Sequence, residues 1–351
     1  GQAATVCCKE HLWKYMTPLQ RTKKGEWGVY STEDIIKIQG NDRGPIVKKT
    51  AKYGSRRLGG AIPLCGAVEY AEKQLPIDPY VLGALLGDGS MRNAQITSGD
   101  PELCDEIGRR LPDTMMIKKN SGKFSWSIRQ KVIDARLNSG NLILNELRKM
   151  GLSAKAGEDG STSKNSYTKF IPREYLEASV SQRLDLLRGL MDTDGSVSKG
   201  CIVEYSTASQ LLMCGVVELV NSLGGKTHVS KRTTCDQNGT KCLSYRIHVT
   251  MYVNPFMLKR KADRWRPVRN RPHRTVTSIV PNGTSDTMCI SVDSPDRTYL
   301  CNDFIVTHNT VAAYIDLNPV RAGLVQDPRD YRWSGYGEAV AGRKRAKLGL
   351  Q

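Results

Sequence analysis

The chain has 351 residues, enough for about two domains, and its 52 Lys and Arg against 35 Asp and Glu give it a formal net charge of +17. Such an excess favours a polyanionic partner, most often nucleic acid, and no apolar run approaches the roughly 20 residues that span a bilayer. No signal peptide is visible either, and ten cysteines without paired zinc-ligand spacing predict a cytoplasmic protein that holds no zinc.

The first informative element is residues 5–18, Thr-Val-Cys-Cys-Lys-Glu-His-Leu-Trp-Lys-Tyr-Met-Thr-Pro. This run resembles the intein motif that usually reads Thr-x-x-His, with Cys8 where Thr is usual. The resemblance implies that His11 activates the scissile amide at the N-terminal splice junction. Trp13 follows in a β-rich segment, where a Trp taken alone is usually a core residue.

Two similar runs follow, Val-Leu-Gly-Ala-Leu-Leu-Gly-Asp-Gly at 81–89 and Leu-Arg-Gly-Leu-Met-Asp-Thr-Asp-Gly at 187–195. Asp78 and Pro79 predict the start of a helix that contains the first run, as N-cap and first helical residue. Both runs resemble the LAGLIDADG motif of DOD-type homing endonucleases, and the second matches it closely. The pair forms an internal repeat.

Glycines in these runs predict how the two helices pack and end. Gly83 and Gly189 remove side-chain bulk, so the helices can lie with their backbones unusually close. We expect Gly89 and Gly195 to stop the helices in a left-handed conformation.

The acids at the ends of the two runs, Asp88 and Asp194, are the predicted catalytic carboxylates. A helix C-terminus carries a partial negative charge and disfavours them, which makes sense if a divalent cation lies between them. Mg²⁺ takes carboxylate oxygens together with water and phosphate oxygens, as phosphodiester hydrolysis requires. The resemblance implies Gly87 and Thr193 as further metal ligands. The alternative is a buried helix pair whose acids cap turns.

A lysine lies between the two runs, in Lys169-Phe-Ile-Pro. In intein endonucleases a lysine in this context is associated with the active site, where it would stabilise the phosphorane charge or orient water. A solvated surface lysine is an equally weighted alternative. Lys226, Lys259 and Lys261 are all candidates for the corresponding lysine of the second half.

Polar and basic residues alternate with apolar ones over 123–130 and 244–251, which predicts half-buried strands. The family's sheets form a saddle over duplex DNA, so this resemblance implies phosphate contacts for affinity and strand side chains that read base edges. The Lys- and Arg-rich run 256–274 adds weight to DNA as the partner. We expect a monomer.

Residues 289–310 begin with Cys289 and end in His308-Asn309-Thr310. The pattern predicts a strand, a turn and a second strand, and it resembles the C-terminal splicing motifs of an intein. An Asn side-chain amide can attack its own carbonyl, closing a succinimide and cutting the chain after Asn309. His308 would polarise that carbonyl or protonate the leaving amine, and Thr310 would first accept an acyl group.

Trp13, Cys289 and Thr310 together resemble the residues that mark class 3 inteins. That resemblance implies that the Cys289 thiolate attacks the N-terminal junction and forms a branched thioester, which then passes to Thr310. The first intein strands are absent, and the chain starts with Gly1 in place of Met, so we expect a missing N-terminal segment without which splicing is incomplete.

Beyond the splice site, residues 314–323 read Tyr-Ile-Asp-Leu-Asn-Pro-Val-Arg-Ala-Gly. This run resembles IS200-like and REP-associated tyrosine transposases and implies a C-extein, with Tyr314 as candidate nucleophile. No His-x-His pair occurs in the sequence to complete that site.

These resemblances imply an α+β chain in which a β-rich Hint splicing domain (1–70 and 275–309) is split by an endonuclease (71–274) and followed by a short helical tail (310–351). The endonuclease would have αββαββα order and two-fold pseudo-symmetry. The implied function is self-catalysed splicing combined with Mg²⁺-dependent, site-specific cutting of duplex DNA. Alternatives are a transposase that carries an inactive remnant and a DNA-binding protein that has lost cleavage.

Overall fold

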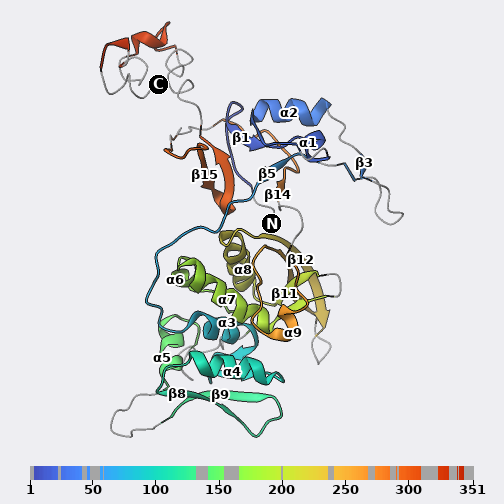
Figure 1. Cartoon of the computed structure of the whole chain (residues 1–351), viewed down its shortest axis with the longest axis vertical. Coiled ribbons are helices and arrows are strands. Elements are labelled where there is room, and N and C mark those ends of the chain that lie inside the picture. Colours follow the sequence, from blue (N-terminus) through green and yellow to red (C-terminus); the bar gives the residue numbers. More distant parts are fainter. Residues whose placement is uncertain are drawn as a thin grey trace. The chain divides into compact units, whose positions relative to one another are not determined.

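The computed structural model divides by contacts into a central unit, Cys65–Pro272, and a flanking unit made of Gln2–Leu64 and His273–Gln351 (Figure 1). It describes residues 4–22, 25–41, 46–47, 56–57, 59–131, 141–153, 166–198, 201–235, 241–267, 273–284, 290, 292–309, 323–331, 338 and 340–343. Within these ranges, no helix is both long enough and apolar enough to cross a membrane.

The central unit repeats one order of elements. Its first half consists of α3 (Pro79–Asp88), β6 (Gly89–Ser90), β7 (Gln95–Thr97), α4 (Pro101–Arg110), β8 (Met115–Lys119), β9 (Ser125–Gln130) and α5 (Leu142–Lys149). After the short α6 (Arg173–Leu176), the second half consists of α7 (Val180–Thr193), β10 (Gly195–Val197), β11 (Val203–Thr207), α8 (Gln210–Ser222), β12 (Lys226–Cys235), β13 (Lys241–Thr250) and α9 (Lys259–Ala262). The antiparallel sheets have the matching orders β6-β7-β9-β8 and β10-β11-β13-β12.

The two central helices start where local chemistry favours a helix start. The Asp78 carboxylate accepts hydrogen bonds from the Tyr80 and Val81 amides, and Pro79 is the first helical residue, which confirms the predicted start of α3. Helix α7 begins with a capping box between Ser179 and Gln182. Both starts therefore satisfy amides that no helical carbonyl reaches.

Helices α3 and α7 pack against each other through Gly83 and Gly189. A Cβ atom at Gly83 would lie 3.0 Å from the amide nitrogen of Leu190 and would collide with the Leu186 carbonyl. A Cβ atom at Gly189 would lie 2.8 Å from the amide nitrogen of Ala84. The predicted close approach of the two backbones is therefore confirmed, and it lies in the middle of the apolar core of the unit.

The predicted left-handed helix ends at Gly89 and Gly195 are wrong. Gly89 is extended, with φ −98° and ψ 151°, and Gly195 has no positive φ, because each chain passes directly from helix into strand β6 or β10. Glycine is required for space: a Cβ atom would lie 2.6 Å from the Leu85 Cα at Gly89 and 2.7 Å from the Met191 Cα at Gly195.

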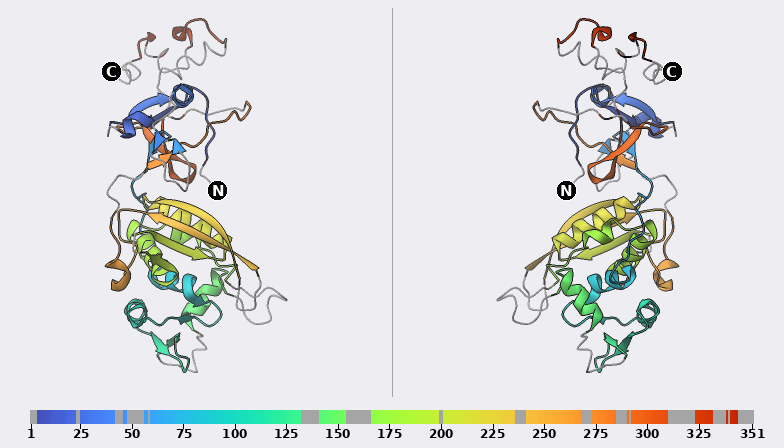
Figure 2. Two further views of the ribbon diagram at one scale, coloured as in Figure 1. Left: turned by 90° about the vertical axis from the view of Figure 1, so that its right-hand side faces the viewer. Right: turned by 90° about the vertical axis from the view of Figure 1, so that its left-hand side faces the viewer.

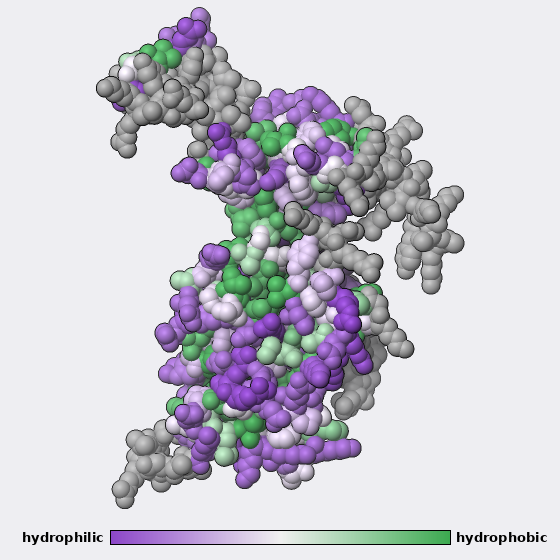
Figure 3. Space-filling view, in the orientation of Figure 1, coloured by the Kyte–Doolittle hydropathy of each residue, from purple (hydrophilic) through white to green (hydrophobic). Residues whose placement is uncertain are grey.

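The predicted strands in 123–130 and 244–251 are confirmed as β9 and β13. Along β13 the side chains of Tyr245, Ile247 and Val249 are buried, whereas Arg246 and His248 lie on the opposite, open face. Figure 2 shows β12 and β13 as a long paired ribbon with α8 beside it, and these three elements are in contact. Where α4 lies at the surface, the residues are mostly hydrophilic (Figure 3).

The flanking unit joins the two ends of the chain through short antiparallel strand pairs. These are β1 (Leu12–Tyr15) with β2 (Gly28–Ser31), β3 (Ile46–Val47) with β4 (Arg56–Arg57), β5 (Ala61–Pro63) with β14 (His273–Thr275), and β15 (Thr298–Cys301) with β16 (Ile305–His308). Helices α1 (Pro18–Thr22) and α2 (Thr32–Asn41) and the 3₁₀ turns η1 (Asn302–Phe304) and η2 (Pro328–Asp330) complete the described elements. The small apolar core contains Trp13, Tyr15, Ile35, Ile62 and Ile305. Strands β15 and β16 confirm the predicted strand-turn-strand before Asn309.

We expect Gly83→Ala to lower the free energy of unfolding by about 1–3 kcal/mol, because the new methyl group must push the α7 backbone away. Urea denaturation checks this value. The matched control is Gly108→Ala in α4, whose Cβ would meet only Ile117 Cγ2 at 3.4 Å and which should be neutral or stabilising by up to about 1 kcal/mol. Equal effects of the two substitutions would contradict the close contact.

Candidate active sites

The two predicted acids meet at the ends of the central helices. Asp88 is the last residue of α3 and Asp194 caps the end of α7, and both keep contact with solvent. The surrounding protein raises the pKa of Asp194 to about 6, through burial first and then through repulsion by the charge of Asp88. Burial also raises the pKa of Asp88, while Lys169 opposes the shift. The helix contact thus brings two mutually repelling carboxylates into one site.

Lys169 is buried beside these acids, which excludes the alternative of a solvated surface lysine. Only 9% of its surface is exposed, and its Nζ donates hydrogen bonds to the carbonyls of Leu85, at 3.2 Å, and Gly87, at 2.7 Å. Burial lowers the pKa of Lys169, while Asp194 and Asp88 counteract the shift. The ammonium group therefore caps the end of α3 and faces both carboxylates.

Of the three candidates for a second lysine, Lys261 lies in the corresponding place. Its Nζ donates to the carbonyls of Met191, Asp192 and Gly195 at 2.8, 2.7 and 2.6 Å and to that of Thr193 at 3.3 Å. Burial lowers the pKa of Lys261 to about 8. Lys261 thus caps the end of α7 as Lys169 caps the end of α3.

The other two candidates lie elsewhere. Lys226 is the first residue of β12, and the backbone amide of Lys259 binds the Glu102 carboxylate. The local sequence around the three lysines does not distinguish them, so only the packing of α9 against α7 identifies Lys261.

Gly87 and Thr193, the two further predicted metal ligands, face each other across the helix contact. A Cβ atom at Gly87 would lie 2.8 Å from the Thr193 Cβ. The Thr193 hydroxyl donates to the Leu190 carbonyl at 2.8 Å, and the carbonyls of Gly87 and Thr193 accept hydrogen bonds from Lys169 and Lys261. Metal ligation by these two residues stays a prediction.

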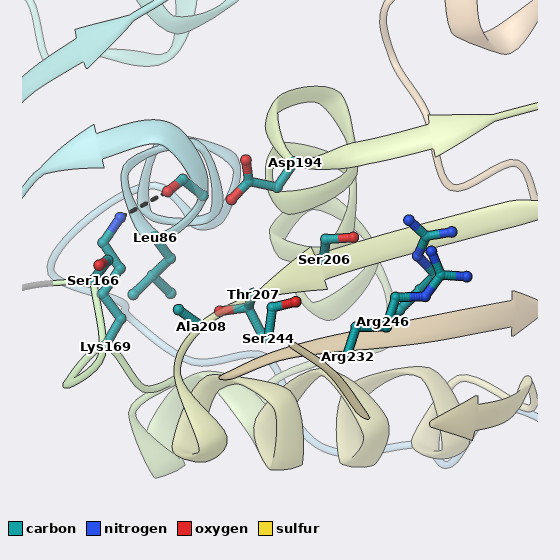
Figure 4. A pocket seen from close by; sticks show the side chains of 11 residues that line it. Leu86, Ser166, Lys169, Asp194, Ser206, Thr207, Ala208, Arg232, Ser244 and Arg246 are labelled. Atoms are coloured by element: carbon teal, nitrogen blue, oxygen red, sulfur yellow. Dashed lines mark hydrogen bonds between the residues drawn. The ribbon is translucent and has the colours of Figure 1, made fainter. Parts of the chain in front are cut away.

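A cavity of about 390 Å³ opens beside Asp194 and Lys169 (Figure 4). Its lining is polar and basic: Gly87, Ser166, Ser206, Thr207, Ser244, Arg232 and Arg246, with Leu86 and Ala208. Figure 4 shows the two arginines on the opposite side of the cavity from Lys169. The sequence had indicated a basic strand face but not these two arginines, because strand register decides that they lie side by side near the acids.

A second group of predicted residues meets in the flanking unit, around His11 and Trp13. The Trp13 indole N–H donates to the Thr32 hydroxyl at 2.9 Å, and the His11 ring lies edge-on to Trp13 with centroids 5.0 Å apart. The His11 Nε2 hydrogen-bonds the Thr307 hydroxyl, which lies in the last strand. Burial, and then the nearby His308, lower the pKa of His11.

His308 and Asn309 are both buried in the same unit. The His308 Nδ1 donates to the Asn309 carbonyl at 2.6 Å, so Nδ1 must carry the hydrogen. The backbone N–H of Asn309 donates a hydrogen bond to the Arg297 carbonyl at 2.7 Å. Its buried Oδ1 has no hydrogen-bond partner among the described residues. Cys289, Thr310 and Tyr314 lie outside the described part of the chain, so their predicted roles stay predictions.

Comparison with known proteins identifies one family model, described as homing endonuclease, which matches residues 170–258. The chain is also 29% identical over 261 residues to the replicative DNA helicase DnaB of Mycobacterium intracellulare. That similarity covers 73% of this chain and 39% of the relative, so the chain spans well under half of the relative's length.

Solved structures of the homing endonuclease I-DmoI also match half of the chain. A structure of a mesophilic variant of I-DmoI is 14% identical to this chain, the match covers 88% of that structure's chain, and the TM-score is 0.32. Complexes with target DNA in the presence of Mg and with DNA and Mn give 12% and 14% identity, 89% coverage and TM-scores of 0.32 and 0.30.

Asp194→Asn should stabilise the protein near neutral pH when divalent ions are removed. The folded-state pKa of about 6 lies above the unfolded value of about 3.9, so the unfolded chain releases its proton first as the pH rises. Stability therefore falls between about pH 4 and 6 and stays lower above that window. Asparagine has no proton to lose, so the gain should be present near pH 7.5 and absent near pH 4.

Thermal unfolding in EDTA measures this difference. The exposed Asp105→Asn is the matched control for removing one carboxylate elsewhere in the unit. A variant at Asp194 that is no more stable than the parent near pH 7.5 would show that the carboxylate is not strained.

Proposed function

We propose that the central unit is a site-specific endonuclease that hydrolyses phosphodiester bonds of duplex DNA with Mg²⁺, and that the flanking unit is an autocatalytic intein-type splicing domain. The observation that carries the nuclease proposal is the meeting of Asp88 and Asp194 at the ends of two helices in backbone contact. Two carboxylates that repel each other, each at the negative end of a helix, are unfavourable for stability alone. A bound cation would relieve that repulsion.

The residues fit Mg²⁺, which prefers carboxylate oxygens and keeps water and phosphate oxygens as further ligands. Asp88 and Asp194 would hold it, and when bound it would activate water and neutralise charge on the phosphate. Lys169 and Lys261 stand beside the acids, where they donate hydrogen bonds to the carbonyls at the ends of α3 and α7. They would stabilise the extra negative charge that develops on the phosphate oxygens.

The open face of the second sheet fits a DNA backbone. Arg232, Arg246, Ser206 and Ser244 line the cavity. The whole chain carries a formal net charge of +17, which favours a polyanion. Guanidinium and hydroxyl groups donate hydrogen bonds to phosphate oxygens, which provides affinity, and side chains along the strands read base edges. Arg246 is also oriented by Glu204 at 3.3 Å, so its position is set before DNA binds.

The similarity to homing endonucleases supports this proposal. The homing endonuclease match covers α7 and the second sheet, including Asp194. The helicase relative needs a different explanation, because this sequence contains no Gly-x-x-x-x-Gly-Lys-Ser/Thr run of the kind that binds ATP phosphates. An inserted element shared by unrelated host proteins accounts for both observations, with 310–351 as the remainder of a transposase-like host.

Asp88→Asn and Asp194→Asn should each reduce Mg²⁺-dependent cutting by about a thousandfold or more, because removing a metal ligand loses several kcal/mol of transition-state stabilisation. Cutting would be measured on a site selected from a randomised duplex library, and binding would be measured separately with Ca²⁺. The control Asp105→Asn should cut normally. Undiminished cutting by either variant would leave only the alternatives, a DNA-binding protein or an inactive remnant.

For the flanking unit, the observation that carries the splicing proposal is the hydrogen bond from His308 to the Asn309 carbonyl. In the proposed step the Asn309 side-chain nitrogen attacks that carbonyl carbon, a succinimide closes, and the peptide bond to Thr310 breaks. The released amine takes up a proton. His308 withdraws electron density from the carbonyl oxygen, which favours attack. Cys289 and Thr310 complete the proposal as successive acyl acceptors, with His11 activating the first junction.

Asn309→Ala should abolish release of the segment that begins at Thr310, and His308→Gln should slow it by about a hundredfold or more. Mass spectrometry of the incubated protein detects the released segment and the succinimide end. The exposed Asn302→Ala in the same unit is the control and should not change the rate. Release that persists after Asn309→Ala would exclude cyclisation.

A further inference from the structure

Asp192 is a buried carboxylate in the last turn of α7, and it binds a segment far along the chain. Only 2% of its surface is exposed. Both carboxylate oxygens lie 3.1 to 3.2 Å from the backbone amides of Met257 and Leu258, and the Tyr80 hydroxyl donates to Oδ2 at 2.9 Å. A buried carboxylate with this many donors is fixed in position.

The segment that Asp192 binds leads directly into the second lysine. Leu258 precedes α9 and has no side chain that can cap the helix. Asp192 binds the amides of Met257 and Leu258 just before the helix, and Glu102 binds the first helical amide, that of Lys259. Lys261 follows within this one-turn helix, and its backbone amide binds the Leu258 carbonyl at 2.9 Å. Its Nζ then returns to the carbonyls at the end of α7. The Asp192 carboxylate at the end of α7 thus binds the segment before α9, and the Lys261 ammonium group of α9 binds the end of α7 in return.

Among the residues of the first half that the structure describes, no buried carboxylate occupies the corresponding position. Leu86, fully buried, occupies the position in its motif that Asp192 occupies in the second. Lys169 is held differently: the buried Ser209 hydroxyl donates to the Lys169 carbonyl at 2.6 Å and accepts from the Leu212 amide. The two lysines therefore depend on different buried polar residues, each belonging to a different part of the fold.

We infer that Asp192 is a positioning residue that fixes Lys261 at the second acid and thereby sets the rate at which one of the two DNA strands is cut. The part that concerns cutting rests on the nuclease function proposed above. Asp192 does not touch the reacting atoms in this assignment. It acts through the backbone of Met257 and Leu258, and its effect is confined to the second half of the site.

The first experiment needs no DNA. Lysine ammonium groups that are held by several carbonyls exchange their hydrogens slowly enough to give separate ¹⁵N–¹H signals, which Lys169→Met and Lys261→Met assign. Asp192→Asn should remove the Lys261 signal and keep that of Lys169, and the matched Ser209→Ala should do the reverse. Tyr80→Phe, which removes only the hydroxyl contact, should keep both signals.

The Lys169 and Lys261 signals decide whether Asp192 positions Lys261. A Lys261 signal that is unchanged in Asp192→Asn overturns it, as does loss of both signals in either variant, since this would mean general loosening. If Asp192→Asn does not fold, Asp192→Glu keeps the charge but displaces the segment, and an unaltered Lys261 signal there also overturns the inference.

The second experiment measures cutting of each strand of the selected duplex, labelled separately. Asp192→Asn should slow one strand by roughly 10- to 100-fold with little change in KM for DNA, so that nicked product accumulates, and Ser209→Ala should slow the other strand. Equal slowing of both strands would contradict the inference. If the unaltered protein cuts no DNA while the lysine signals respond as expected, the positioning role stands and the nuclease assignment fails.

Discussion

The backbone contact between α3 and α7 is the constraint on which the central unit depends. At Gly83 and Gly189 each helix occupies the space that a side chain of the other would need, and both helices contribute to one large apolar cluster. This contact delivers Asp88 and Asp194 to one place, although their charges and the helix dipoles oppose the arrangement. The apolar burial along both helices offsets that opposition, so the site stores electrostatic strain that the rest of the fold sustains.

The two buried lysines, Lys169 and Lys261, reduce the electrostatic strain at these helix ends by adding positive charge. A helix ends with carbonyls that have no partner, and an ammonium group there satisfies several of them while opposing the negative end of the dipole. Lys169 and Lys261 do this for α3 and α7. Because the acceptors are carbonyls of the motifs themselves, each lysine is held beside its acid by the backbone that also positions the acid. Structural capping and placement for chemistry are therefore one arrangement.

What the sequence could predict follows from how local each feature is. The start of α3 depends on Asp78 and its immediate neighbours, and the crossing glycines belong to a repeated run, so both were predictable. The conformation of Gly89 was not, because space against Leu85 and not chain handedness selects the glycine. Lys261 could not be chosen among similar lysines, since carboxylates distant in sequence, Asp192 and Glu102, bind the backbone where α9 begins. The arginines beside the cavity depend on strand register in the same way.

In the flanking unit the chain leaves and returns at neighbouring points of one strand pair. Strand β5 ends at Pro63 and β14 begins at His273, and these two residues are paired opposite each other. A long segment between such points adds little to the entropy of closing the loop, because that term grows only slowly with length. The unit can thus join His11 from the first stretch to Thr307 from the last while a folded unit is inserted between them. Its candidate site needs both stretches, since His11 and Trp13 belong to the first and His308 and Asn309 to the last.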